Sequence, residues 1–162
     1  MKLLLLALAS SALFAIDCVD FSGTYSGKCK LDGKEYGTNL DIKQTGCEKM
    51  DIGSETIQNG QSLGKSKSTL EIGRKIPINN TTSDFEVKGS YEAQWAPAAG
   101  KSDTLGLNQE ATVFKEGKET STTKGTTEMK LDTSTKVLTL NSHVEFTGSS
   151  NTTKVHMTCE LK

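Results

Sequence analysis

The sequence predicts an all-β protein built as an antiparallel meander, and three observations lead to this prediction. Short runs in which apolar and polar residues alternate recur along the chain, with the period of a half-buried strand. Asp32-Gly33 and Asn59-Gly60 separate such runs, and both dipeptides favour the tight turns of β-hairpins. Beyond the N-terminal segment, no stretch combines a helical period with a cap and an apolar stripe.

The hairpin around Asp32-Gly33 is the best-defined element. If the turn lies there, the numbers of facing residues sum to 65. Because side chains alternate across a strand, this register sorts apolar from polar residues onto opposite faces. The apolar face then holds Phe21, Tyr25, Cys29, Leu31, Tyr36, Leu40 and Ile42.

The N-terminal residues 1–15 predict a secretory signal peptide. One early lysine is followed by a short apolar run that ends in small residues, and this run is too short to cross a bilayer comfortably. We therefore expect an exported protein, periplasmic or extracellular, in which residues 16–162 form a single domain. No other run reaches membrane length, so we expect no membrane-spanning segment.

Four cysteines in an exported chain predict two disulfides. The hairpin register favours Cys18–Cys47, on the outer face, and leaves Cys29–Cys159 to join the first strand to the last. Two alternatives stay open, because sequence alone does not fix connectivity. Cys29 and Cys159 could remain reduced, or the pairs could be Cys29–Cys47 and Cys18–Cys159.

The rest of the chain predicts further strands. Met50 and Ile52 mark a short strand that ends at Gly53, the state of residues 61–67 stays open, and residues 69–78 form one stretch interrupted by Gly73 and Pro77. Residues 79–84 and 96–103 are loops by composition. The clearest later strands cover residues 85–95, 105–113, 138–146 and 155–161. We expect about eight or more strands closed into an up-and-down barrel, with a β-sandwich as the alternative.

The segment Asp20-Phe21-Ser22-Gly23-Thr24-Tyr25 resembles the Gly-x-Trp opening of the calycin group, which includes lipocalins, avidins and fatty-acid-binding proteins. Tyr25 stands where those families place tryptophan, and the resemblance covers the first strand only. It implies a barrel with one open end and a small-molecule cavity. The helical lid of fatty-acid-binding proteins and the C-terminal helix of lipocalins are not apparent in this sequence.

Composition and motifs argue against several function classes. The formal net charge is −1 with lysines and acidic residues interspersed, and Arg74 is the only arginine, so nucleic acid is not an expected partner. The sequence indicates no Ser-His-Asp arrangement, no phosphate-binding glycine loop and no inward pair of carboxylates. We expect no enzymatic activity and no cofactor.

The two histidines, His143 and His156, face each other on the outer surface if the last hairpin sums to 299, and lie diagonally if it sums to 301. Glu145 is a nearby carboxylate. Two imidazoles on an exposed face are too few ligands for a structural or catalytic metal, so we predict no metal site.

Four inward aromatic residues are the candidate ligand-binding groups: Tyr25, Tyr36, Tyr91 and Trp95. Each combines an apolar body with a polar tip, which suits a pocket for a small, partly apolar ligand. The alternative is that they fill a solid core. The sequence thus predicts a non-enzymatic ligand-binding barrel, or else a secreted or envelope-associated module, such as an inhibitor or adhesin, that contacts a protein partner through residues 79–84 and 97–103. It does not indicate an oligomeric state.

Three asparagines, Asn79, Asn80 and Asn151, lie in Asn-x-Thr acceptor patterns. In a eukaryotic secreted protein these positions would be candidates for N-glycosylation. The pattern also arises by chance, and in a bacterium it would normally carry no meaning.

Overall fold

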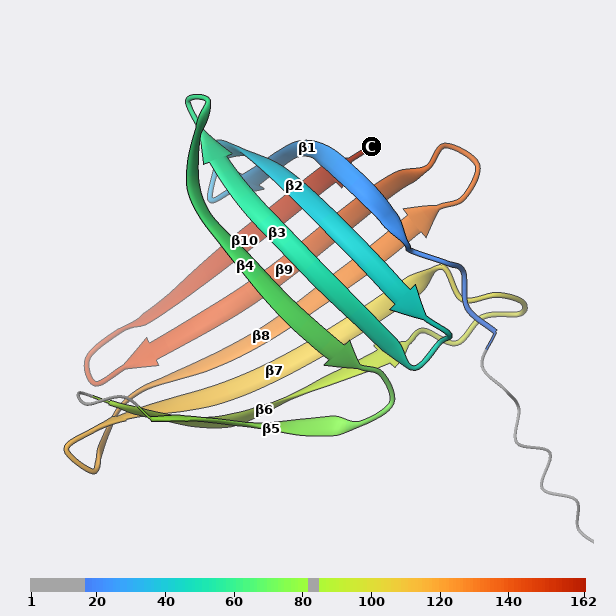
Figure 1. Ribbon diagram of the computed structural model, residues 1–162. Helices are drawn as coiled ribbons and strands as arrows, with labels where there is room; N and C mark the ends of the chain where they lie inside the picture. Colours follow the sequence, from blue (N-terminus) through green and yellow to red (C-terminus); the bar gives the residue numbers. More distant parts are fainter. Residues whose placement is uncertain (1–16, 82–84) are drawn as a thin grey trace, which may run out of the picture.

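The computed structural model describes residues 17–81 and 85–162, which form ten antiparallel strands in one sheet (Figure 1). The strands follow one another in chain order, and β1 also pairs with β10. Their bounds are β1 Gly23–Leu31, β2 Lys34–Thr45, β3 Lys49–Gln58, β4 Gln61–Glu71, β5 Lys75–Thr81, β6 Glu86–Trp95, β7 Thr104–Lys115, β8 Lys118–Asp132, β9 Val137–Gly148 and β10 Thr152–Leu161. The predicted signal peptide lies outside the described residues.

The β1–β2 hairpin has the predicted turn and register. Asp32 and Gly33 both have positive φ, 47° and 83°, as a type I′ turn requires. Tyr25 pairs with Leu40, and the facing residue numbers sum to 65. The same pair of left-handed conformations recurs at Asn59-Gly60, so the sequence located both turns correctly.

The sheet curls into a nearly closed barrel with one seam, the gap between edge strands β4 and β5. Two hydrogen bonds join β4 and the β4–β5 turn to β6 beside the seam: Gly73 N donates to Ala93 O at 2.7 Å, and the Tyr91 hydroxyl donates to Thr69 O at 3.0 Å. The predicted antiparallel barrel is therefore confirmed, with ten strands and one unsealed seam.

The expectations for the middle of the chain need correction. The strand predicted to end at Gly53 continues to Gln58, because its outer half is held by pairing with β4. Residues 61–67, left open, lie within β4. The stretch 69–78 is divided between β4 and β5, since Gly73 turns the chain with a φ of 80°. Residues 79–81 of the loop predicted at 79–84 belong to β5, which extends to Thr81, and residues 82–84 lie outside the described residues.

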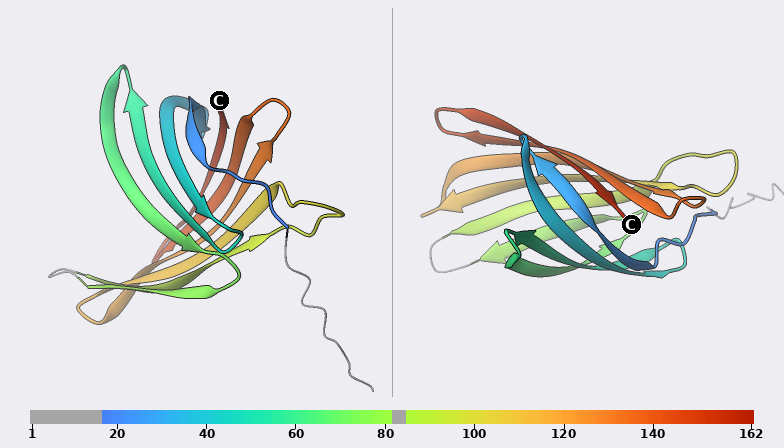
Figure 2. Two further views of the ribbon diagram at one scale, coloured as in Figure 1. Left: turned by 45° about the vertical axis from the view of Figure 1, so that its right-hand side comes forward. Right: turned by 90° about the horizontal axis from the view of Figure 1, so that it is seen from above.

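The core lies at one end of the barrel, where the chain enters before β1. Phe21, Leu138 and Leu161 are completely buried there, and the segment around Phe21 covers this end. Toward the other end, strands β1–β4 diverge from strands β5–β10 (Figure 2). We call these groups the four-strand leaf and the six-strand leaf, and their two ends the packed end and the open end.

Both disulfides have the connectivity that the hairpin register favours, Cys18–Cys47 and Cys29–Cys159. Cys29 on β1 and Cys159 on β10 pair directly with each other, and their Cα atoms are 4.0 Å apart. The outer-face location expected for Cys18–Cys47 is wrong. Cys18 belongs to the buried core cluster, because the chain before Gly23 leaves the strand register and folds over the packed end.

Asp132 gives a first prediction, about pH. Its carboxylate accepts hydrogen bonds from Ser134 Oγ, Ser134 N and Thr135 N, which lower its pKa from 3.8 to about 2. A depressed pKa stabilises the fold above the unfolded-state value, and this contribution is lost as pH falls from about 3.8 to about 2. In urea unfolding, the stability difference between wild type and Asp132→Asn should therefore shrink over this interval. A difference that stays constant would contradict the assignment.

Candidate functional site

Two of the four predicted ligand-binding residues lie in the packed end. Tyr25 is 7% exposed, and its hydroxyl donates to Phe21 O at 2.9 Å. Burial raises the pKa of this phenol. Trp95 is equally buried, and its indole N–H donates to Cys47 O at 2.8 Å. These side chains form the floor beneath the open end, with their polar tips already bound to backbone carbonyls.

The other two, Tyr36 and Tyr91, are half-buried and lie closer to the open end. Tyr36 pairs across the sheet with Cys29, on the same face as the first-to-last disulfide. Tyr91 packs against the core, and its hydroxyl reaches across the seam to Thr69. The structure thus separates the four aromatic residues by depth.

Apolar side chains continue along the inner face of the six-strand leaf beyond the core. Strand alternation puts Val144 and Phe146 on the same face as fully buried Leu138. We call this surface the inner wall; its members are Val87, Ala111, Val113, Val144, Phe146 and Val155, which are in register across β6–β10. Phe146 is 45% exposed and the other members are half-buried. The inner wall is therefore an apolar surface that the four-strand leaf leaves accessible.

Gly125 lies in the middle of the inner face and is buried despite having no side chain. A Cβ there would approach Gln109 Cγ at 3.2 Å and Val144 Cγ2 at 3.4 Å. The amide of Gln109 therefore lies over Gly125 beside Val144, and it adds a hydrogen-bonding group to the apolar surface. Gln109 has the same inward parity on β7 as buried Leu105.

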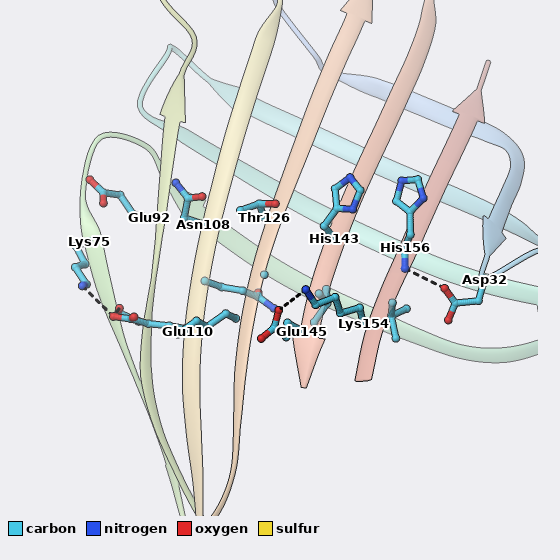
Figure 3. A pocket seen from close by; sticks show the side chains of 16 residues that line it. Asp32, Lys75, Glu92, Asn108, Glu110, Thr126, His143, Glu145, Lys154 and His156 are labelled. Atoms are coloured by element: carbon cyan, nitrogen blue, oxygen red, sulfur yellow. Dashed lines mark hydrogen bonds and ion pairs between the residues drawn. The ribbon is translucent and has the colours of Figure 1, made fainter. Parts of the chain in front are cut away.

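A separate hollow of about 690 Å³ lies on the outer face of the six-strand leaf (Figure 3). Most of its lining residues have the parity opposite to the core residues of the same strands, while Gln109, Gly125, Val144 and Val155 border it with the inward parity. One row of paired residues crosses five strands: Glu92, Asn108, Thr126, His143 and His156. We call it the outer row. No single strand displays it, so it is recognised only when the registers of four strand pairs are combined.

The histidine pair has the first of the two registers considered from the sequence, with residue numbers summing to 299. The two rings stack with centroids 4.2 Å apart and planes 6° from parallel, and His156 Nε2 lies 2.8 Å from Asn141 Oδ1. Ring nitrogens bind a metal within the plane of the ring, so parallel stacked rings do not point at a common ion. No group of three or more potential metal ligands is found within residues 17–81 and 85–162.

The Asn-x-Thr asparagines lie on exposed backbone. Asn79 and Asn80 are on the edge strand β5, and Asn151 is in the β9–β10 turn. Glycosylation at these positions stays a prediction.

The comparisons with known proteins identify the fold. No family model matches the chain, and no curated protein matches its sequence. The crystal structure of a mutant of the fluorescent protein UnaG is similar over 88% of this chain and 94% of its own, with 15% identity and a TM-score of 0.50. Rv2717c from M. tuberculosis is similar over 87% of this chain and 91% of its own, with 12% identity and a TM-score of 0.53. At these identities the likeness shows a calycin-like barrel fold, as the first strand suggested.

Within the described residues, no helix is long and apolar enough to cross a membrane.

Proposed function

We propose that this protein is an exported, non-enzymatic barrel that binds a small, partly apolar ligand against the inner wall. One observation carries the proposal: the inner face is solid at the packed end and accessible at the open end. Leu138 is fully buried, whereas Phe146, eight residues further along the same face of β9, is 45% exposed. Accessible apolar surface inside a barrel is typical of ligand-binding sites.

The polar groups around the inner wall indicate the ligand's chemistry. Gln109 offers an amide beside Val144, and Thr127 and Ser142 share a hydrogen bond at 2.9 Å on the same inner face. No lysine or carboxylate has this inward parity on β7–β10 between the core and the inner wall. An uncharged or weakly polar ligand with an apolar body suits these neighbours. Of the four predicted aromatic residues, Tyr36 and Tyr91 would flank it, with Tyr25 and Trp95 as the floor.

A dye titration with paired variants tests the proposal. The apolar dye 1-anilinonaphthalene-8-sulfonate should bind wild type saturably, with a rise in fluorescence. Val144→Asp puts a carboxylate into the inner wall and should weaken binding by about tenfold or more, since burying an unpaired charge costs more than about 1.4 kcal/mol.

Thr139→Asp is the matched control, because Thr139 is exposed on the outer face of the same strand. It should bind the dye as wild type does. Thermal unfolding of all three proteins checks that the dye reports a folded state rather than a loosened core. Equal binding by Val144→Asp and Thr139→Asp, or no saturable binding by wild type, would refute the inner-wall site.

A further inference from the structure

Most residues that line the outer-face hollow lie on the opposite side of the strands from the inner wall, and the inner-wall members Val144 and Val155 also border it. Its volume of about 690 Å³ is within the usual range of small-molecule sites. The side chains that line it are mostly polar, unlike those of the inner wall. The hollow therefore suits a different kind of ligand.

Charges at the hollow largely compensate one another. Lys75 Nζ lies 3.2 Å from Glu110 Oε1, and Lys154 Nζ lies 3.4 Å from Glu145 Oε2. These ion pairs lie along one side of the outer row (Figure 3). The lysine beside Glu110 holds its pKa below the usual value, so Glu110 stays ionised near neutral pH. With positive and negative groups mixed in this way, the hollow does not select strongly for an anion or a cation.

The centre of the outer row offers hydrogen bonds that the protein itself does not use. Within residues 17–81 and 85–162, the side chains of Asn108 and Thr126 have no hydrogen-bond partner. They are direct neighbours on β7 and β8. An amide and a hydroxyl can each both donate and accept, which matches the hydroxyl groups of a polyol.

His143 borders the same place from the next strand. One face of its ring stacks on His156, so the opposite face is turned toward the Thr126 side. Thr126 on β8 has a short side chain. The neighbouring strands β7 and β9 are about 9.6 Å apart, which is twice the strand spacing, so a slot is left between their side chains. The slot is bordered by the flat imidazole of His143, the hydroxyl of Thr126 and the amide of Asn108. It suits a ring with apolar C–H faces and polar edges.

We propose that the outer-face hollow is a second binding site, specific for an uncharged polyhydroxylated ligand, namely a neutral saccharide. Asn108 and Thr126 bind its hydroxyl groups, and the free face of His143 packs against its C–H groups. The saccharide can come as a free sugar or as part of an immobilised glycan, and both present the same chemistry.

A glycan array of neutral oligosaccharides, probed with the fluorescently labelled protein, tests the proposal and supplies a probe. The best neutral glycan is then titrated in soluble form, with backbone amide NMR as the readout. Shifts should concentrate at the outer row. The double variant Asn108→Ala/Thr126→Val should lose affinity by about tenfold or more, as loss of two hydrogen bonds predicts. If soluble glycan competes with the array for the protein, the saccharide ligand is a free sugar. If the protein binds the array only, the ligand is an immobilised glycan.

Two control variants distinguish binding in the hollow from binding elsewhere on the barrel. Thr158→Val changes an exposed residue of β10 on the same outer face, outside the hollow, and should bind as wild type does. Val113→Asp changes an inner-wall residue that does not line the hollow, and this variant should bind the glycan normally, so the test does not depend on the inner-wall proposal. His143→Phe keeps a flat ring and should retain more affinity than His143→Ala. Three results would overturn the proposal. They are that no neutral glycan binds, that the double variant binds as wild type does, or that raising the salt concentration to about 0.5 M abolishes binding.

Discussion

Replacing both Cys29 and Cys159 by alanine should lower the free energy of unfolding by about 5 kcal/mol, the largest effect expected of any change in this protein. The two residues are 130 positions apart, so their bond closes most of the chain into a loop and restricts the unfolded state strongly. Because β1 and β10 also close the hydrogen-bonded sheet, the bond reinforces the one pairing that joins the ends of the domain.

Urea unfolding measures this effect, with Cys18→Ala/Cys47→Ala as the comparison. The Cys18–Cys47 bond spans only 29 positions. The same dependence on the length of the closed loop gives a smaller loss in the free energy of unfolding, about 3.5 kcal/mol. The expected order of stability is therefore wild type, then the Cys18/Cys47 variant, then the Cys29/Cys159 variant. The reverse order of the two variants would contradict the assignment of Cys29–Cys159 as the main covalent closure.

Trp95→Ala should be the most damaging single substitution, with a loss of about 3–5 kcal/mol. The indole lies 5.4 Å from the Phe21 ring, between centroids, in the packed end. Its truncation would leave a void there and would remove the donor that Cys47 O now accepts. The bond to Cys47 also links the end of β6 to the β2–β3 turn, so both leaves would be affected.

Trp95→Phe is the matched control, since it keeps an aromatic ring and removes the N–H donor. It should cost less, about 1–2 kcal/mol, for the lost hydrogen bond and imperfect packing. Chemical denaturation followed by circular dichroism gives both values. A Trp95→Ala variant as stable as wild type would mean that the packed end is not the core of the fold.

The sequence predicted most of the strand register, because turn residues and alternation are local signals. Asp32-Gly33 specified the first hairpin, and its register, extended past Gly23, predicted the Cys18–Cys47 bond that the structure contains, although the chain before Gly23 leaves that register. The segment before Gly23 was misplaced because its position depends on packing against Ser102 and the core, which no local pattern encodes. For the same reason, one interrupted stretch was expected where β4 and β5 form the two sides of the seam.

The candidate sites were less accessible to sequence reasoning. Alternation identifies the inward residues of a strand, but it does not tell where along the strand the opposite leaf stops covering them. Leu138 and Phe146 follow the same alternation, yet only Leu138 is buried. The outer row is assembled from five strands, so it follows from long-range registers that no single segment contains.

The most direct test of the central claim is native mass spectrometry of the protein expressed and purified from its own source, with Val144→Asp prepared in parallel. If the inner wall binds a ligand, wild type should carry one additional small-molecule mass that the variant lacks, while Thr139→Asp keeps it. The claim that the inner wall binds a ligand would be contradicted if wild type showed only the mass of the folded chain. It would also be contradicted if Val144→Asp carried the same additional mass.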